Sequence, residues 1–218
     1  MPIIVMIGPQ GSGKGTQSDI LAKRLGIPHV SMGRIFRAEI ASGSELGKQI
    51  ANIVATGYLV PTQVADQVLE ERFSKEDLRN GVIFDGFPRN IEQVAALDAL
   101  LARYEQKLDH VVYIHVSDEM LERRLAKRSV CTNPACQASY HLEFRPPREP
   151  GKCDLCGAPI SQRLDDTPEV IRQRLQIYRD ETSRLIDFYR HWGLLREVGG
   201  EQPVEQVAAA VAKAIGME

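Results

Sequence analysis

The sequence predicts an α/β fold, a doubly wound parallel sheet with helices on both faces. Short apolar runs alternate with longer amphipathic segments, which is the pattern of strands and their covering helices. The first run ends at a glycine-rich loop that leads into a helical segment. The chain of 218 residues is long enough for one large domain that carries inserted subdomains.

The predicted strands and helices follow one another along the chain. Short runs rich in β-branched residues, typical of strands buried on both faces, span residues 3–7, 82–84, 111–116 and 194–198. Helical spacing of apolar residues covers 14–25, 91–103, 118–127, 168–189 and 204–215. In the first helix this spacing includes Ile20, Leu21 and Leu25, and Gly26 is its expected end.

Two segments interrupt the alternation and are expected to be inserted subdomains. Residues 31–60 have the pattern of short helices with no strand between them, and residues 130–166 are rich in cysteine, proline and glycine. The expected core therefore comprises residues 1–30, 61–129 and 167–218.

Composition argues against several functional classes. A formal net charge of −2 and a pI near 6.2 are unlike a dedicated nucleic-acid binder, which usually carries a basic excess. No run approaches the roughly 18 apolar residues of a membrane span. The start, MPIIVMIGPQG, lacks the basic region and cleavage site of a secretory signal, so we expect a cytoplasmic protein with reduced thiols.

The stretch GPQGSGKGT, residues 8–16, predicts a phosphate-binding loop, so the expected sheet is of the P-loop type. Its glycines let backbone N–H groups face phosphate oxygens, while the following helix N-terminus and Lys14 add positive charge. A glycine turn without a ligand is the weaker alternative, because a strand precedes the loop and a helix follows it.

The loop departs from the usual motif directly after its lysine. A Mg²⁺-binding Ser or Thr is usual there, but this chain has Gly15, and the hydroxyl comes at Thr16. We expect phosphate oxygens and water to hold the Mg²⁺, with Asp85 at the end of strand 82–84 orienting the water. Without the phosphate loop, a capping role would be the better reading of Asp85.

All four cysteines lie in one stretch, as the pairs Cys131/Cys136 and Cys153/Cys156. Both spacings lie within the range of zinc ligands, and four thiolates would fix a segment too short for its own core. A disulfide staple is disfavoured in a cytosolic chain. A nucleic-acid zinc finger would need a basic helix after the second pair, where GAPISQRLDD stands instead. His141 is expected to be structural, although it could replace one sulfur.

Four stretches in order, GPQGSGKGTQ, GSELGKQ, NGVIFDGFPRNIEQ and the cysteine segment ending in SQRLDD, resemble adenylate kinases of the long-lid bacterial type. The sequence DGFPR after GKGT is specific to nucleoside monophosphate kinases. The resemblance covers almost the whole chain. It implies Mg²⁺-dependent phosphoryl transfer from ATP to AMP to give two ADP, a helical AMP-binding insert at 31–60, a lid at 130–166 with structural Zn²⁺, and a monomer.

The resemblance also implies roles for individual residues. Asp85 orients the waters of Mg²⁺, and arginines surround the transferred phosphate because they stay charged and grip two oxygens. The implied catalytic residues are Lys14, Arg89, Arg124, Arg128, Arg163 and Arg174 together with Asp85. The implied ATP-binding residues are Gly11, Ser12, Gly13, Lys14, Gly15, Thr16, Arg124, Arg128, Ser139, Tyr140 and Gln202. The implied AMP-binding residues are Met32, Arg37, Leu59, Val60, Gly86, Arg89, Gln93, Arg163 and Arg174. Arg123 and Arg172 are expected to be surface residues.

The chain departs from the family in two places. The stretch SMGRIFR has Met32 and Arg34 where the family has threonine and an acid, and the first cysteine pair is two residues wider than usual. We expect AMP to remain the acceptor with weaker discrimination between bases, although a neutral Met32 is equally compatible with the pattern. The alternatives are another nucleoside monophosphate kinase and, in a different class, a zinc-dependent nucleic-acid-binding module.

Overall fold

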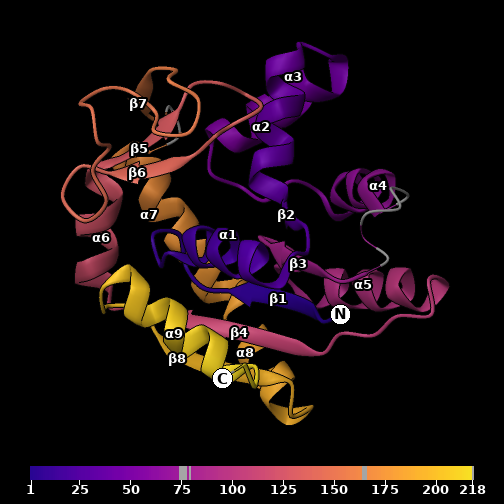
Figure 1. Cartoon of the computed structure of the whole chain (residues 1–218). Coiled ribbons are helices and arrows are strands. Elements are labelled where there is room, and N and C mark those ends of the chain that lie inside the picture. Colours follow the sequence, from indigo (N-terminus) through magenta and orange to yellow (C-terminus); the bar gives the residue numbers. More distant parts are fainter. Residues whose placement is uncertain (74–77, 79, 164–165, 218) are drawn as a thin grey trace. The chain divides into compact units, whose positions relative to one another are not determined.

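The computed structural model describes residues 1–73, 78, 80–163 and 166–217 (Figure 1). The chain divides into two compact units. The core unit comprises Met1–Met32, Val60–Val116 and Leu175–Glu218, and the insert unit comprises Gly33–Leu59 and Ser117–Arg174. Leu164 and Asp165, near the end of the expected lid, lie outside the described residues.

A five-stranded parallel sheet forms the centre of the core unit. Its order is β2-β3-β1-β4-β8, with β1 (Ile3–Ile7), β2 (His29–Ser31), β3 (Val82–Asp85), β4 (His110–His115) and β8 (Leu195–Gly199). The central strand β1 is parallel to both neighbours, β3 and β4, and all five of its residues are buried. The four predicted strands are confirmed within a residue or two. The short strand β2 was missed.

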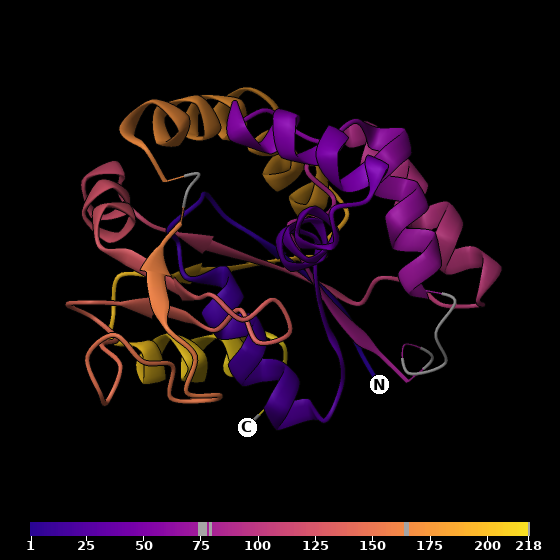
Figure 2. The ribbon, with the colours of Figure 1, turned by 90° about the horizontal axis from the view of Figure 1, so that it is seen from above.

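Helices cover both faces of this sheet (Figure 2). Helices α1 (Lys14–Leu25) and α9 (Val204–Ala214) lie on one face, and α5 (Ile91–Arg103) and α8 (Arg184–His191) lie on the other. Where α1 and α9 pack on the sheet, Ile4 of β1, Leu21 of α1 and Val211 of α9 belong to one apolar cluster. The predicted bounds of α1 and α5 are confirmed, and the α/β fold with them. Helix α4 (Thr62–Phe73), which packs against α5, was not predicted.

The helical segment predicted over 168–189 is confirmed, but it is not one regular α-helix. The structure has α7 (Pro168–Ile177), a π-helical turn η2 (Tyr178–Thr182) and then α8. The N–H of Ser183 donates to the carbonyl of Tyr178 at 2.8 Å, five residues back, so this turn is one residue wider than an α-helical turn.

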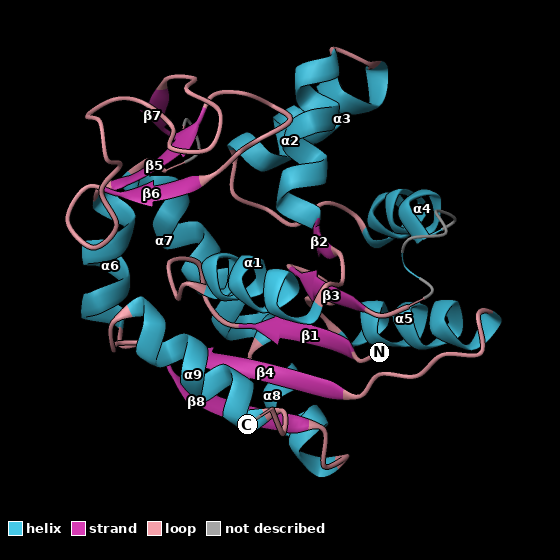
Figure 3. Ribbon diagram, in the orientation of Figure 1, coloured by secondary structure: helices cyan, strands magenta, loops and turns pink. Residues whose placement is uncertain are grey.

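The insert unit contains helices and a small antiparallel sheet (Figure 3). The helices are α2 (Met32–Ser42), whose first residue belongs to the core unit, α3 (Glu45–Ala55), α6 (Asp118–Ala126) and most of α7; the sheet order is β6-β5-β7, with β5 (Arg128–Cys131), β6 (Ser139–His141) and β7 (Ile160–Gln162). Because α6 ends at Ala126, Arg128 lies on a strand. The four-residue spacing of Arg124 and Arg128 alone would predict that they share one helical face, and the structure shows that this prediction is wrong.

The stretch GSELGKQ has a structural explanation in the contact between α2 and α3. Ser44 caps α3 by accepting the N–H of Gly47 at 2.8 Å. A Cβ atom at Gly47 would lie 2.2 Å from the carbonyl oxygen of Glu39, so only glycine allows the two helices to approach this closely. None of the described helices is both long and apolar enough to cross a membrane.

Candidate phosphate site and cysteine cluster

The loop of residues 8–16 connects β1 to α1, as predicted. Gly11 and Gly13 have φ angles of 87° and 94°, in the left-handed region that glycine adopts without strain. The N–H of Ser12 closes a turn on the carbonyl of Pro9 at 3.2 Å, and Lys14 Nζ donates to the same carbonyl at 3.3 Å. The lysine ammonium therefore lies back over the loop, next to the first turn of α1.

Close packing holds the base of this loop. A Cβ atom at Gly8 would lie 2.7 Å from Ser12 Oγ and 2.8 Å from the carbonyl oxygen of Ile114 on β4. Gly200, after β8, is equally constrained, because its Cβ would lie 2.5 Å from Ile114 Cγ2 and 3.2 Å from the Ser12 carbonyl oxygen. Gly200 was missed by sequence reasoning. The Gly199–Gly200 pair directly after the last predicted strand was the available signal.

Asp85 ends β3 beside this loop. Its Oδ2 lies 3.3 Å from the position that a Cβ of Gly15 would occupy, and Ser31 Oγ donates to Oδ2 at 3.4 Å. Its Oδ1 is buried and accepts no hydrogen bond from the described residues. Burial alone would raise the pKa of this carboxyl, but its contact with His29 and the charges of Lys14 and Arg89 outweigh burial and hold the pKa well below its usual range. Asp85 is therefore an anion with one unused buried oxygen.

His29 was missed by sequence reasoning, although it contacts Asp85. It begins β2, its side chain is 5% exposed, its Nδ1 lies 2.8 Å from Asp19 Oδ1, and its Nε2 lies 3.7 Å from Asp85 Oδ2. Burial lowers the pKa of His29, but the two carboxylates outweigh burial and raise it above 6.5. A polar residue in a three-residue strand gives no periodic signal that would reveal this role.

The DGFPR segment folds compactly at the carboxyl end of β3. Gly86 has a φ of 81°, and Arg89 Nε donates to its carbonyl oxygen at 3.0 Å. The amide oxygen of Gln93 accepts the N–H of Arg89 at 2.8 Å, and Asn90 caps α5 by accepting the N–H of Gln93 at 2.9 Å. The Phe87–Pro88 peptide bond is cis. Arg89, whose charge acts on Asp85, is therefore held by the buried amide of Gln93.

The other predicted residues of the core unit lie at more varied positions. Thr16 is in the first turn of α1, Met32 and Val60 are buried, and Gln202 is exposed in the turn before α9. Of the implied AMP-binding residues, Arg37, Leu59, Arg163 and Arg174 belong to the insert unit instead.

Several predicted arginines of the insert unit have specific partners. Arg128 forms a bidentate pair with the buried carboxylate of Asp166, with Nε at 2.7 Å from Oδ2. Arg174 donates to the carbonyl of Val54 on α3 at 3.3 Å, Arg163 follows β7, and Arg124 on α6 lies 5.8 Å from the ring centre of Phe144. The expectation of surface positions for Arg123 and Arg172 is confirmed, with side chains 54% and 71% exposed.

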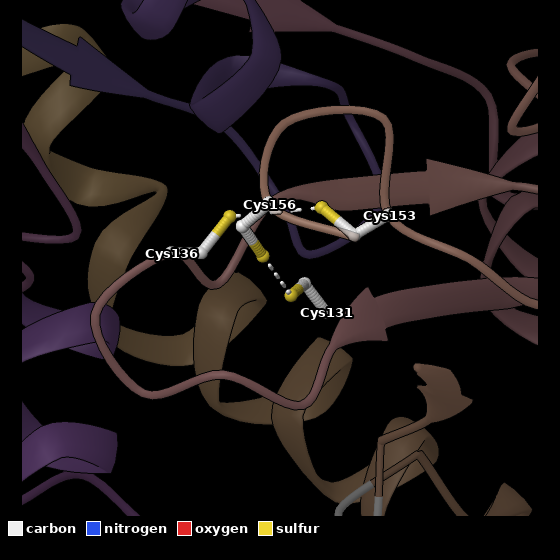
Figure 4. Close-up of side chains that lie close together, drawn as sticks. All are labelled: Cys131, Cys136, Cys153 and Cys156. Carbon is white, nitrogen blue, oxygen red and sulfur yellow. Dashed lines mark hydrogen bonds between the residues drawn. The ribbon is translucent and has the colours of Figure 1, made fainter. Parts of the chain in front are cut away.

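The four cysteines converge at one point (Figure 4). Cys131 Sγ lies 3.4 Å from Cys156 Sγ, Cys136 Sγ lies 3.7 Å from Cys153 Sγ, and all four sulfurs lie within 4.8 Å of one another. Sulfurs bound tetrahedrally to Zn²⁺ at about 2.3 Å lie about 3.8 Å apart, so this set fits a Zn²⁺ ion. All four are free thiols, because a disulfide would need an S–S distance of about 2.05 Å.

The two cysteine pairs form equivalent turns despite their different spacing. The N–H of Cys131 donates to the carbonyl of Ala138 and that of Cys153 to the carbonyl of Ala158, each at 2.8 Å. The extra residues of the first pair therefore lengthen the turn without moving its sulfurs away from the cluster. His141 is structural, as expected: its Nδ1 accepts the N–H groups of Glu143 and Phe144.

Tyr140 belongs to the cysteine cluster. Its hydroxyl donates to Cys153 Sγ at 3.3 Å and accepts the N–H of Asp154 at 2.7 Å. Burial would raise the pKa of Cys153, but this hydroxyl and the N–H groups of Leu155 and Cys156 lower it to about 6, which favours the metal-binding thiolate. Since the phenol is buried, any contact of Tyr140 with ATP would involve its backbone. Ser139, its neighbour on β6, is half-buried.

Comparisons with known proteins give matches over almost the whole chain. The family model described as adenylate kinase matches residues 6–194. The chain is 44% identical to the adenylate kinase of Symbiobacterium thermophilum over 212 residues, 97% of each chain. It is 41% identical to the adenylate kinase of Caldicellulosiruptor bescii over 99% of each chain, and 42% identical to that of Moorella thermoacetica over 99% of this chain and 98% of the other.

Proposed function

The chain belongs to the adenylate kinase family, and on that premise we propose how its own residues carry out the reaction. The protein transfers a phosphoryl group between ATP and AMP, which in the reverse direction consumes two ADP and so balances the adenine nucleotides. The observation that supports the proposed site most strongly is Asp85, an anion with an unused buried oxygen beside the phosphate loop.

The donor phosphates bind at the loop of residues 8–16. The left-handed glycines turn backbone N–H groups toward the loop interior, and the first turn of α1 adds its partial positive charge. Lys14 then moves from the Pro9 carbonyl to the outer phosphates, while Thr16 adds a hydroxyl. The ATP base lies by the backbone at Gln202.

Asp85 is proposed to orient water on the Mg²⁺ that accompanies ATP. When bound, the ion would supply positive charge that neutralises the phosphate oxygens. Asp85 stays ionised because of its lowered pKa, and its Oδ1 can accept a hydrogen bond from one water molecule. Gly15 allows this arrangement, because a side chain there would approach Asp85 Oδ2.

On the acceptor side, Arg89 and Gln93 are the proposed AMP ligands of the core unit. The Gln93 amide oxygen already accepts from the backbone of Arg89, so its NH₂ group is the one that donates to the base. Arg37 in α2 holds the AMP phosphate, and Met32, Leu59, Val60 and Gly86 line the pocket. Residues 31–60 are thus the proposed AMP-binding subdomain.

Arginines of the insert unit are proposed to neutralise the transferred phosphoryl group. Arg124, Arg163 and Arg174 act by charge and position, since phosphoryl transfer needs little covalent help from the protein. Arg128 acts from a fixed position, because Asp166 orients its guanidinium. Residues 130–166 form the proposed lid, which excludes water that would otherwise hydrolyse ATP.

The cysteine cluster is proposed to hold structural Zn²⁺ in this lid. The sulfur spacing and the matching turns support a closed four-sulfur site. Metal analysis of the purified protein should find about one zinc per chain. Substoichiometric zinc in a fully folded lid would contradict the assignment. A cytoplasmic monomer is proposed as well, and sedimentation tests its oligomeric state.

The deciding experiment measures phosphoryl transfer from Mg·ATP to AMP, dAMP, GMP, CMP and UMP, each alone. Rapid ADP formation with AMP alone supports the proposed acceptor site and makes Met32 a tolerated change. Comparable kcat/KM for several bases would show that the SMGR stretch has altered acceptor choice. ATP binding without transfer to any acceptor would contradict the proposed sites, and a salt-dependent RNA gel shift would then favour the nucleic-acid alternative.

A further inference from the structure

Gln137, the residue after Cys136, contacts helix α2 through both ends of its side-chain amide. Its Oε1 accepts the Nε–H of Arg37 at 2.7 Å, and its Nε2 donates to the carbonyl of Arg34 at 3.0 Å. The same Nε2 donates to the carbonyl of Pro134 at 2.9 Å, within its own turn. One side chain therefore joins α2 to the cysteine turn, which is 100 residues away in the sequence.

The backbone of Gln137 is unusual for a residue with a side chain. Its φ is 49°, in the left-handed region that glycine occupies without cost, and its N–H donates to the carbonyl of Asn133 at 3.0 Å. Glycine would close this turn equally well. The contacts with Arg37 and Arg34 are what glutamine adds at this position.

Arg37 is also shaped to receive this contact. A Cβ atom at Gly33, one helical turn earlier on α2, would lie 3.2 Å from Arg37 Nη1. The absence of that atom lets the guanidinium lie along the helix. Because Gln137 takes the Nε–H, a phosphate cannot use this hydrogen of Arg37 while the contact lasts, which excludes the side-on bidentate geometry.

We propose that Gln137 is a positioning residue for Arg37 and that it couples the lid to the acceptor phosphate site. This inference rests on the proposed function, which gives Arg37 the AMP phosphate and gives the cysteine segment the role of a lid. Gln137 holds a long, flexible guanidinium in one orientation before AMP arrives. AMP binding therefore does not have to order the Arg37 side chain, because Gln137 has already done so.

The same contact makes donor and acceptor binding interdependent. The hydrogen bonds to α2 form only while the cysteine turn lies against that helix. A nucleotide that stabilises the lid in this arrangement therefore also stabilises Arg37 for AMP, and by thermodynamic reciprocity AMP favours the same lid arrangement. Gln137 thus tightens AMP binding most when the ATP site is occupied.

The test uses Gln137→Gly, which suits the left-handed backbone and removes only the side chain. Gln49→Ala, at an exposed glutamine on α3, is the matched control. We expect the KM for AMP to rise about tenfold, the loss of about 1.4 kcal/mol, while the kcat and the KM for ATP change less than about twofold. Calorimetric titration with AMP is carried out with and without a non-hydrolysable ATP analogue. The analogue should increase the AMP affinity of the wild type, and this increase should be largely lost in Gln137→Gly.

Three outcomes would overturn the inference. An unchanged KM for AMP would show that Arg37 needs no positioning, and a lower KM would show that Gln137 competes with AMP. A uniform loss of kcat and of both affinities, with a lower Tm, would show a merely structural role. Arg37→Ala separates the two proposals: if it raises the KM for AMP and Gln137→Gly does not, only the inference fails. If Arg37→Ala leaves that KM unchanged, the assignment of Arg37 fails.

Discussion

Replacing His29 by leucine should lower the stability of the protein, and more so at low pH than at high pH. The imidazole is buried between Asp19 at 2.8 Å and Asp85 at 3.7 Å. Because the pKa of His29 is raised above 6.5, the protonated ring is the form that the fold stabilises. Leucine fills similar volume but leaves the Asp85 carboxylate without this cation.

The size of the effect follows from the burial of the two contacts. Asp19 is 41% exposed, so its pair with His29 contributes no more than about 0.5 kcal/mol. At the 3.7 Å separation from Asp85, the Coulomb attraction in a protein environment is about 4 kcal/mol before desolvation. Burial of the ring, the largest influence on its pKa, removes much of this. We expect a net loss of about 2 kcal/mol, or about 4–8 °C in Tm for a chain of this size.

The sign of the pH dependence follows from the direction of the pKa shift. A histidine whose pKa is raised by folding contributes fully below its unfolded value of 6.5, and the contribution disappears as pH rises through the folded value. Thermal unfolding of His29→Leu and the wild type at about pH 6 and about pH 9 measures this. His191→Leu, at an exposed histidine, is the control. Equal losses at both pH values, or a larger loss at high pH, would refute the reasoning.

Two further substitutions each test one carboxylate, Asp85 in the core unit and Asp166 in the insert unit. Asp85→Asn keeps the shape of the side chain but removes the charge that orients Mg²⁺ water. Initial rates measured over a range of Mg²⁺ concentrations should therefore be about 10- to 100-fold lower than those of the wild type. An unchanged dependence of the rate on Mg²⁺ would contradict the assigned role. Asp166→Asn leaves the half-buried Arg128 guanidinium without its buried carboxylate and should destabilise the protein by about 3 kcal/mol in urea unfolding. Asp187→Asn, whose carboxylate is 85% exposed, should cost far less, and equal losses for the two variants would mean that the buried pair does not stabilise the lid.

The parts of the fold that sequence reasoning predicted are those with local signals. Helix α1 lies between Gly13 and Gly26, two left-handed glycines that mark its ends, and its predicted bounds are correct. Strand β2 has only three residues, two of them polar, so no period-2 pattern can form. The π-helical turn η2 changes hydrogen bonding by one residue within a continuous helical pattern, which periodicity does not reveal.

In the site, too, sequence reasoning found the residues of contiguous motifs and missed those that act through contacts distant in the sequence. The phosphate loop and the cysteine pairs are contiguous motifs whose residue types are dictated by phosphate and thiolate chemistry. His29, Gly200 and Gln137 act through contacts with residues 56, 86 and 100 positions or more away in the sequence, and of the three only Gly200, in its glycine pair, has a local signal. The resemblance to a family supplied the arginine assignments, but Asp166 as the partner of Arg128 became visible only in the structure.

The departure at Gly15 and the position of Asp85 are one structural feature. In the usual loop, serine or threonine after the lysine binds Mg²⁺ directly, so the motif alone predicts that Gly15→Ser improves metal binding. The structure predicts the opposite, because any Cβ there lies 3.3 Å from Asp85 Oδ2 and requires the carboxylate to shift by a few tenths of an ångström. Gly15→Ala adds the Cβ atom without a hydroxyl, so it tests the steric effect alone. Helix propensity favours alanine over glycine by up to about 1 kcal/mol, so the Tm of this variant should be maintained. Its kcat should nevertheless fall as that of Gly15→Ser does. A serine variant that transfers phosphate as fast as the wild type, or binds Mg²⁺ more tightly, would show that this loop accepts a side chain and that Asp85 does not depend on the glycine.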